Sequence, residues 1–326
     1  QPAIDNEEAH HWVMPFDLKT DRSTVSAPEG PSASSVAMDV MKEHIENGEK
    51  IMAIDAAIPG VFGLDEIKNK YPENYHDVGI AEQESVAFAA GMAKEGAVPV
   101  LFENSTFLQR AFDQLSHDVA ANDLPVIMMV AGGGISGTSK THLGVFDQVM
   151  ISNLPNWIYL APTTLAEEKD MMEWAIKQRK HPVAIKMPTK PVPAGEDVKR
   201  DYSEIKYDIK PGKDVAILAL GDMYDMLGRE VAEKLGASLV NPISANILDK
   251  DALDTLADEN KVIVTLEDNI LDGGFGEKIA SYLGDKDVKV LNYGQKRIYT
   301  DQVPLDEILK DNRMTVDQIV EDVRNA

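Results

Sequence analysis

One carboxylate stands where a predicted strand runs into a predicted helix. Residues 76–84 read HDVGIAEQE, in which the strand is expected to end at Gly79 and the helix to begin near Ala81. Glu82 then lies in the first turn of the helix, beyond the carboxyl end of a strand, where open α/β sheets bind their ligands. A carboxylate at that place also complements the helix N-terminus. A ligand-facing role and a structural role therefore both stay open for Glu82.

Two further segments carry residues that could contact a ligand. Phe107 and Arg110 lie in residues 105–114, STFLQRAFDQ, where core packing and a salt bridge are the ordinary alternatives. His142 follows the stretch AGGGISG at 131–137, which is typical of a loop that comes close to a ligand. A lone histidine is more often structural. The loop also lacks the Gly-Lys-Ser/Thr ending of nucleotide-binding phosphate loops.

The elements that must position these residues alternate along the chain. Helical periodicity fills the gaps between short apolar runs, which predicts a doubly wound parallel sheet. A proline-rich connector at 188–197 follows, and a smaller α/β unit begins near residue 200. We expect an α/β protein of two domains, at 34–192 and 200–326, after a polar linker or arm at 1–33. The apolar runs of the first domain lie at 51–54, 98–102, 124–130, 157–160 and 183–187.

The composition limits the class of protein. A length of 326 residues favours two domains, and 44% hydrophobic residues are typical of a soluble globular protein. No apolar run reaches the roughly 18 residues of a membrane span, so no membrane association is expected. The absence of cysteine excludes disulfides and is compatible with a cytoplasmic location. The formal net charge of −23 disfavours nucleic acid as a partner.

Several segments, in order, resemble the transketolase family of thiamine-diphosphate-dependent enzymes. The likeness spans nearly all of residues 15–326, and it is closer to the 1-deoxyxylulose-5-phosphate synthase branch than to transketolases proper, which have GVREH in place of GIAEQ. The similar segments are PFD at 15–17, GIAEQ at 79–83, STFLQRAFDQ at 105–114, HDVA at 117–120, THLGVFD at 141–147, LEDN at 266–269 and GGFG at 273–276.

This resemblance implies a pyrimidine-binding domain followed by a C-terminal domain, with thiamine diphosphate and Mg²⁺ as cofactors. It implies a transferase that decarboxylates pyruvate and condenses the two-carbon unit with an aldehyde such as glyceraldehyde 3-phosphate. Glu82 is then expected to bond the pyrimidine N1′ from a partly desolvated position, with Phe107 stacked on the ring and Arg110 beside it. His142 is expected to face the substrate, where it bonds an oxyanion or moves a proton.

The sequence departs from the branch where substrate phosphate is held. VAGG at 130–133 and MPTK at 187–190 replace segments that carry arginines in the synthases, and Asn104 replaces a tyrosine. Arginine can bind phosphate through two parallel hydrogen bonds, whereas lysine offers a single charged ammonium group. Lys140 and Lys190, with Lys186, could compensate in part, although exposed lysines are usually only solvated. The identity of the acceptor aldehyde therefore stays open.

The diphosphate half of the cofactor site is missing from this sequence. Gly221-Asp222-Met223 with Asn241 does not fit the family's Gly-Asp-Gly and Asn segment, and no metal-ligand spacing stands out. Since the first residue is Gln1, the chain can be an excised fragment or a processed product. We expect an upstream domain or subunit to hold the diphosphate and Mg²⁺, and the chain to be inactive alone.

The resemblance also implies a homodimer that binds small-molecule substrates. Two other functions stay open. One is a transketolase, or a subunit of a split transketolase whose diphosphate-binding domain is a separate chain. The other is a non-catalytic relative that retains the fold, although the presence of Glu82, Phe107 and His142 together argues against it.

Overall fold

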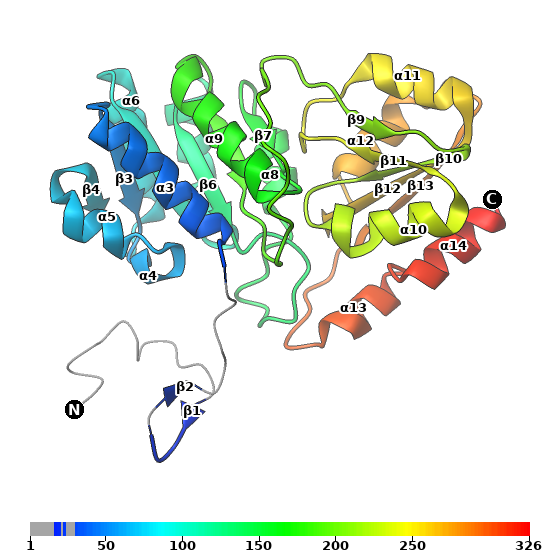
Figure 1. Ribbon diagram of the computed structural model, residues 1–326, viewed down its shortest axis with the longest axis horizontal. Coiled ribbons are helices and arrows are strands. Elements are labelled where there is room, and N and C mark those ends of the chain that lie inside the picture. Colours follow the sequence, from blue (N-terminus) through cyan, green and yellow to red (C-terminus); the bar gives the residue numbers. More distant parts are fainter. Residues whose placement is uncertain (1–15, 21, 24–29) are drawn as a thin grey trace.

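The computed structural model describes residues 16–20, 22–23 and 30–326, which form two α/β units side by side (Figure 1). The first unit has a six-stranded sheet in the order β4-β3-β5-β6-β8-β7, and every pair in it is parallel. Its strands are β3 (Ile51–Asp55), β4 (Tyr75–Asp77), β5 (Val98–Asn104), β6 (Ile127–Ala131), β7 (Ile158–Leu160) and β8 (Val183–Lys186).

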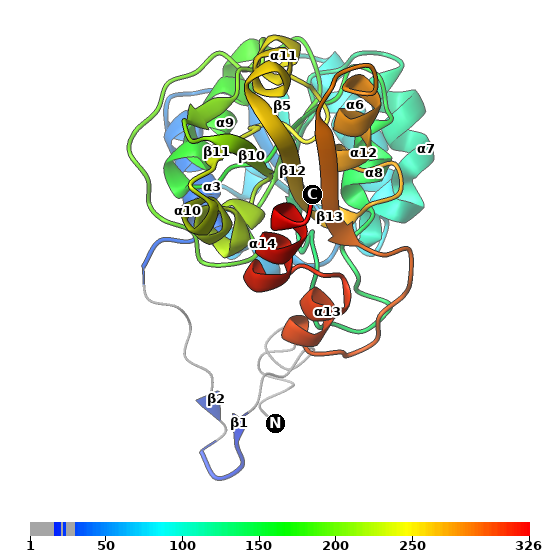
Figure 2. The ribbon, with the colours of Figure 1, turned by 90° about the vertical axis from the view of Figure 1, so that its right-hand side faces the viewer.

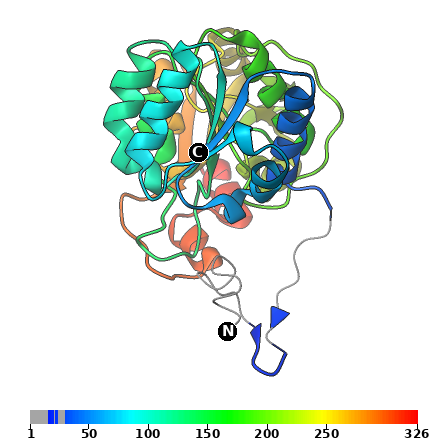
Figure 3. The same cartoon turned by 90° about the vertical axis from the view of Figure 1, so that its left-hand side faces the viewer.

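Helices cover both faces of this sheet. Seen from the side in Figure 3, α3 and α9 lie on one face while α6, α7 and the neighbouring η3 lie on the other. The helical elements are α3 (Ala33–Glu46), α4 (Pro59–Phe62), α5 (Asp65–Lys70), η1 (Pro72–Asn74), α6 (Glu82–Lys94), η2 (Phe107–Ala111), α7 (Phe112–Gln114), η3 (Leu115–Ala120), α8 (Asp147–Ser152) and α9 (Leu165–Gln178). This arrangement is that of a doubly wound fold.

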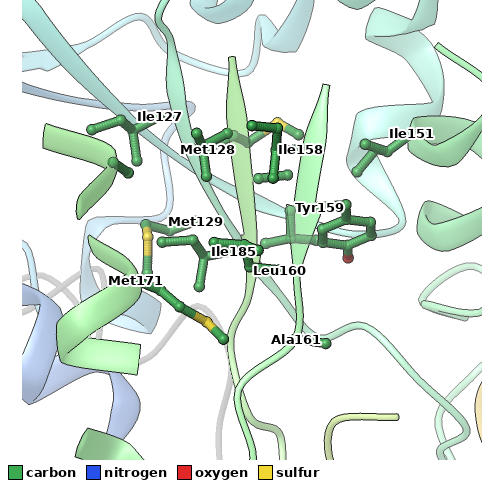
Figure 4. Packing of buried hydrophobic residues seen from close by; sticks show 14 of the residues in the cluster. Ile127, Met128, Met129, Ile151, Ile158, Tyr159, Leu160, Ala161, Met171 and Ile185 are labelled. Carbon is green, nitrogen blue, oxygen red and sulfur yellow. The ribbon is translucent and has the colours of Figure 1, made fainter. Parts of the chain in front are cut away.

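The central strands carry apolar residues on both faces, as a sheet covered on both sides requires. Figure 4 shows Met128 and Met129 of β6 beside Ile185 of β8, with Tyr159 of β7 and Met171 of α9 packed around them. All five of these side chains are fully buried. The apolar runs read from the sequence therefore correspond to β3, β5, β6 and β8 inside the sheet and to β7 at its edge.

The second unit has a five-stranded sheet in the order β13-β12-β10-β11-β9, in which only β9 is antiparallel. Figure 2 shows α10 packed with α14 on one face, and α11 and α12 on the other. The elements are β9 (Asp208–Lys210), β10 (Asp214–Ala219), η4 (Tyr224–Gly228), α10 (Arg229–Leu235), β11 (Ser238–Asn241), α11 (Lys250–Glu259), β12 (Asn260–Ile270), α12 (Phe275–Tyr282), β13 (Lys289–Gln295), α13 (Leu305–Asp311) and α14 (Val316–Arg324).

The predicted fold class, two α/β units in succession, is confirmed. The predicted domain limits of 34–192 and 200–326 stay a prediction. The linker expected over 1–33 lies mostly outside the described residues, although β1 (Phe16–Asp17) and β2 (Arg22–Ser23) form a short antiparallel pair there. Within the described part of the chain, every helix is too short or too polar to cross a bilayer.

The two units are joined along β7, the edge strand of the first sheet. The backbone N–H of Ala161 donates to Ile243 O at 2.8 Å, and that of Ala245 donates to Tyr159 O at 2.8 Å. A segment of the second unit thereby satisfies backbone groups that an edge strand leaves unpaired.

A buried ion cluster lies at the same junction. Lys186 Nζ lies 3.2 Å from Asp268 Oδ1 and 3.7 Å from Asp147 Oδ2, and all three side chains are almost fully buried. Burial by itself lowers the pKa of the Lys186 ammonium. The nearby carboxylates of Asp147, Asp268 and Asp222 have the larger, opposite effect, so the pKa is raised. Lys186 is therefore a structural cation between the two units.

Substitution of Lys186 tests this role. Lys186→Met leaves two buried carboxylates without their counter-charge, so we expect the free energy of unfolding to fall by about 3–5 kcal/mol. Urea unfolding measures the change. The matched control is Lys261→Met, since Lys261 pairs with Asp214 at 3.2 Å on the exposed surface and should contribute at most about 1 kcal/mol. Equal effects of the two substitutions contradict this account.

Candidate functional site

Glu82 is the first residue of α6, directly after a loop that leaves β4. Gly79 has a φ of +72°, a conformation that favours glycine, and its N–H donates to Asp77 Oδ1 at 2.8 Å. This tight turn places Ala81 at the N-cap and directs Glu82 inward, where only 3% of its surface is exposed. The helix therefore starts where the sequence predicted, and the carboxylate is desolvated as expected.

The Glu82 carboxylate has one charged neighbour and one oxygen that lacks a hydrogen bond. Arg110 Nη1 lies 3.2 Å from Glu82 Oε2, and about half of the Arg110 side chain is exposed. The geometry of this contact is not that of a hydrogen bond, so Oε2 is buried without a hydrogen-bond donor among the described residues. Such a group costs free energy unless a partner reaches it. The salt bridge considered for Arg110 therefore forms with Glu82 itself.

Phe107 and His142 lie together near this pair. Phe107 begins η2, the element that carries Arg110, and its ring centroid is 5.7 Å from that of His142 in an edge-to-face arrangement. Thr106 Oγ1 donates to Thr141 O at 3.2 Å, which ties η2 to the His142 loop. These contacts bring Phe107, Arg110, Glu82 and His142 together at the carboxyl edge of the first sheet.

The His142 ring is oriented by its own loop. Its Nδ1 lies 3.2 Å from Ser139 Oγ and 3.0 Å from Thr141 Oγ1. Both polar contacts that the structure gives this ring are therefore on one nitrogen. Among the described residues, no hydrogen bond is made by Nε2.

The glycines on either side of His142 make close contacts inside the protein. A Cβ on Gly144 would lie 1.8 Å from Gly132 O, and one on Gly134 would lie 2.4 Å from Asp268 Oδ2. A Cβ on Gly137 would lie 2.8 Å from Val303 O. These glycines therefore let the loop pack closely against itself and against the second unit, and the expectation that the loop comes close to a ligand stays a prediction.

The lysines expected to hold phosphate are placed less favourably. Lys140 is on the His142 loop, but its Nζ lies 3.9 Å from Asp301 Oδ2, and its N–H donates to Asp301 Oδ1. Lys186 is held in the ion cluster at the junction. Lys190 is half-buried, and among the described residues no ion pair or hydrogen bond joins it to Glu82 or His142.

The residues that resembled a diphosphate site have structural partners. Asp222 Oδ2 accepts hydrogen bonds from the N–H and the hydroxyl of Thr189, at 2.9 and 2.6 Å. Asn241 Nδ2 donates to Glu167 Oε1 at 3.0 Å. In the part of the chain that the structure describes, no group of three or more His, Asp or Glu side chains is placed to hold a metal ion.

Sequence reasoning missed two buried carboxyl groups behind Glu82. Glu103, on β5, and Asp55, at the end of β3, are both fully buried. Burial, together with the nearby carboxylates of Glu82 and Asp55, raises the pKa of Glu103 to about 8. The available signal was a single glutamate directly after the apolar run at 98–102, within β5.

Comparisons with known proteins agree with the fold class. Residues 29–193 match the family described as "Transketolase, pyrimidine binding domain", and residues 204–319 match "Transketolase, C-terminal domain". A solved structure described as "Split gene transketolase, inactive beta4 tetramer" superposes with a TM-score of 0.78 at 24% identity. The match covers 91% of this chain and 98% of that one. At this identity the likeness concerns the fold.

Relatives named 1-deoxy-D-xylulose-5-phosphate synthase are more similar in sequence. That of Clostridium acetobutylicum is 38% identical over 90% of this chain and 49% of its own length. That of Geobacter sulfurreducens, named synthase 1, is 36% identical over 95% of this chain and 50% of its own length. This chain therefore spans about half the length of these relatives. Since the match to the pyrimidine-binding domain alone covers about half of the chain, and the C-terminal domain follows it, this chain belongs to the transketolase family.

Proposed function

We propose that this chain is the pyrimidine-binding and C-terminal part of a thiamine-diphosphate-dependent transferase similar to 1-deoxyxylulose-5-phosphate synthase. The observation that carries the proposal is the buried Glu82 carboxylate at the start of α6, which has an oxygen without a hydrogen-bond donor beside Arg110. A protonated ring nitrogen of an aminopyrimidine is the donor that this oxygen lacks.

The residues around Glu82 fit an aminopyrimidine ring. Glu82 would bond the ring at N1′, Phe107 offers an aromatic face on the same side, and Arg110 balances the charge of the carboxylate. When bound, thiamine diphosphate supplies a carbon nucleophile and an electron sink. Glu82 holds the proton that sets the ring's acid-base state, and its burial keeps water from competing for that proton.

His142 has a separate role on the substrate side. Its Nδ1 is engaged by Ser139 and Thr141, so Nε2 is the atom that we propose faces the substrate. From there it would donate a hydrogen bond to a developing oxyanion or move a proton. The edge-to-face contact with Phe107 holds the ring in place for this task.

The substrates that we propose are pyruvate and an aldehyde such as glyceraldehyde 3-phosphate. The relatives named as synthases support this reaction. The phosphate end of the acceptor would depend on Lys140 and Lys190, since the arginines of the branch are absent. The ammonium of Lys140 lies near the Asp301 carboxylate, which neutralises part of its charge. Among the described residues, the positive charge of Lys190 is therefore less neutralised than that of Lys140. A smaller or uncharged aldehyde is the alternative acceptor.

The diphosphate and Mg²⁺ would be held by an upstream domain or a separate subunit, without which this chain is inactive. This view is supported by the fact that the chain aligns with only about half the length of the relatives named as synthases. A split transketolase subunit is the second candidate, favoured by the likeness in fold to the solved split-gene transketolase. A non-catalytic relative remains the third, and it accounts less well for a buried carboxylate oxygen that lacks a donor.

We also propose that the chain pairs as a homodimer through α6. A groove lined by Ala87, Phe88, Gly91 and Met92 runs along the outer face of this helix, with Lys50 and Glu95 at its margins. Apolar surface of this kind, rimmed by opposite charges, suits a second copy of the same surface. Pairing there would bring α6, and so Glu82, to the dimer axis.

Glu82→Gln tests the cofactor role. In the chain joined to its upstream diphosphate-binding domain, with Mg²⁺ and thiamine diphosphate, we expect CO₂ release from pyruvate to fall at least about 10²-fold, because the amide cannot hold the proton. The matched control, Glu73→Gln, changes an exposed glutamate in η1 and should leave the rate unchanged. Undiminished release in the Glu82 variant contradicts the proposal.

Lys190→Ala tests the phosphate contact. With glyceraldehyde 3-phosphate as acceptor we expect KM to rise roughly tenfold or more, the effect of losing one charged hydrogen bond. With unphosphorylated glyceraldehyde, KM should not change. Steady-state kinetics with both acceptors makes the comparison, and equal effects on the two argue against a phosphate role.

Gly91→Arg tests the pairing surface. A Cβ at Gly91 meets open space, so the chain should fold, but the guanidinium fills the groove and sedimentation should show a monomer. The control is Gly91→Ala, which should stay dimeric and gain up to about 1 kcal/mol of stability as a helix-interior replacement of glycine. A dimeric arginine variant places the interface elsewhere.

A further inference from the structure

Glu103 is a buried acid whose nearest polar partner belongs to the helix that carries Glu82. Its side chain is fully buried between β5 and α6, and its Oε1 lies 2.8 Å from Ser85 Oγ. The other oxygen, Oε2, is buried and lacks a hydrogen-bond donor among the described residues. No ion pair of Glu103 with a basic side chain occurs in the described part of the chain. An ionised Glu103 would therefore lack a counter-charge.

The two hydrogen-bond contacts of the Ser85 hydroxyl indicate whether the Glu103 side chain carries a proton. Ser85 Oγ lies 2.8 Å from the backbone oxygen of Glu82 as well as 2.8 Å from Glu103 Oε1. A hydroxyl has one proton to donate and two lone pairs to accept with. If Ser85 donates to the Glu82 carbonyl, as serine does in a helix, the second contact needs a proton on Glu103. With that proton in place both contacts are ordinary hydrogen bonds.

We propose that Glu103 is a neutral carboxylic acid that donates to Ser85, which in turn donates to the backbone of Glu82, and that it is a positioning residue for the Glu82 carboxylate. This inference rests on the proposed function, since it assigns Glu103 a role behind the same site. The chain of two hydrogen bonds fixes the first turn of α6 from the interior of the sheet. A neutral Glu103 also adds no second negative charge next to Glu82.

The charges that face Glu103 favour the neutral form. Asp55 on β3 and Glu82 on α6 are both acidic, and Arg110 on η2 pairs with Glu82 and not with Glu103. Burial raises the pKa of Glu103 most, and the two nearby carboxylates add to it, which gives a value of about 8. Asp55 is less affected, as burial raises its pKa to about 6.

Infrared spectroscopy of the full chain tests the protonation state directly. The wild-type spectrum minus that of Glu103→Gln should contain the carbonyl band of a protonated carboxylic acid near pH 7, and the band should disappear as pH rises through about 8. The subtraction is needed because burial also raises the pKa values of Glu168 and Glu267 to about 8. A difference spectrum without this band near pH 7 overturns the proposal.

Stability against pH gives a second readout. The folded pKa of about 8 exceeds the ordinary value of 4.5, so the unfolded chain releases this proton first. The folded state then loses stability as pH rises between these two values. Relative to Glu103→Gln, wild type should therefore become less stable across this window and level off above about pH 8. A flat difference contradicts a neutral Glu103.

Affinity for thiamine diphosphate tests the positioning role. In the chain joined to its upstream domain, Glu103→Met and Ser85→Ala each break the link, and each should weaken binding about tenfold, the upper effect of one hydrogen bond. Glu103→Gln can still donate to Ser85 and should rescue most of the affinity. If Glu103→Gln weakens binding as much as Glu103→Met, positioning through a donated hydrogen bond is wrong. If the infrared band is present but Glu82→Gln is fully active, the proposed function fails while the protonation of Glu103 stands.

Discussion

The carboxylate of Glu82 is buried at the first turn of a helix, and much of the structure around it follows from the need to place it there. Its burial requires a tight turn at Gly79 and a helix N-terminus that complements negative charge. It also requires a cation within reach, which η2 supplies as Arg110. One oxygen remains without a hydrogen-bond donor. This buried carboxylate is therefore able to accept a hydrogen bond from a ligand.

The second unit reaches this site through the junction between the sheets. Asn269 Nδ2 donates to Asp147 Oδ1 at 3.0 Å, and Ser105 Oγ donates to the same oxygen at 2.8 Å. Ser105 precedes Thr106 and Phe107, so the segment that starts η2 is anchored partly by the C-terminal unit. The backbone of Gln302 also donates to Thr138 O at 3.0 Å, on the loop that carries His142. Movement of one unit against the other would therefore disturb both halves of the proposed site.

The charge distribution separates structural cations from those available to a substrate. The chain carries a formal net charge of −23, so an anionic substrate must be attracted locally. Lys186 is compensated by Asp147 and Asp268, and Lys140 faces Asp301. The acceptor end of the proposed site is thus less basic than a count of lysines suggests.

The sequence by itself determined the fold class and the place of Glu82 in it. Hydrophobic alternation is a local property, so the apolar runs identified β3, β5, β6, β7 and β8 of the first sheet, and the segment GIAEQ marked the start of α6. It also indicated the four residues Glu82, Phe107, Arg110 and His142, which the fold brings together. Their roles stay proposals, but their proximity follows from short segments at the carboxyl ends of strands in one parallel sheet.

Only the tertiary structure decided how the polar groups are paired. Lys186 and Asp268 are 82 positions apart in the numbering, and nothing local shows that a lysine at the end of β8 is trapped between two sheets. The same holds for Gly134, which approaches Asp268, and for Glu103, which meets Ser85 of α6. Burial and counter-charge depend on which elements become neighbours in space. The sequence therefore determined which residues could do chemistry, and long-range packing determined which of them are free to do it.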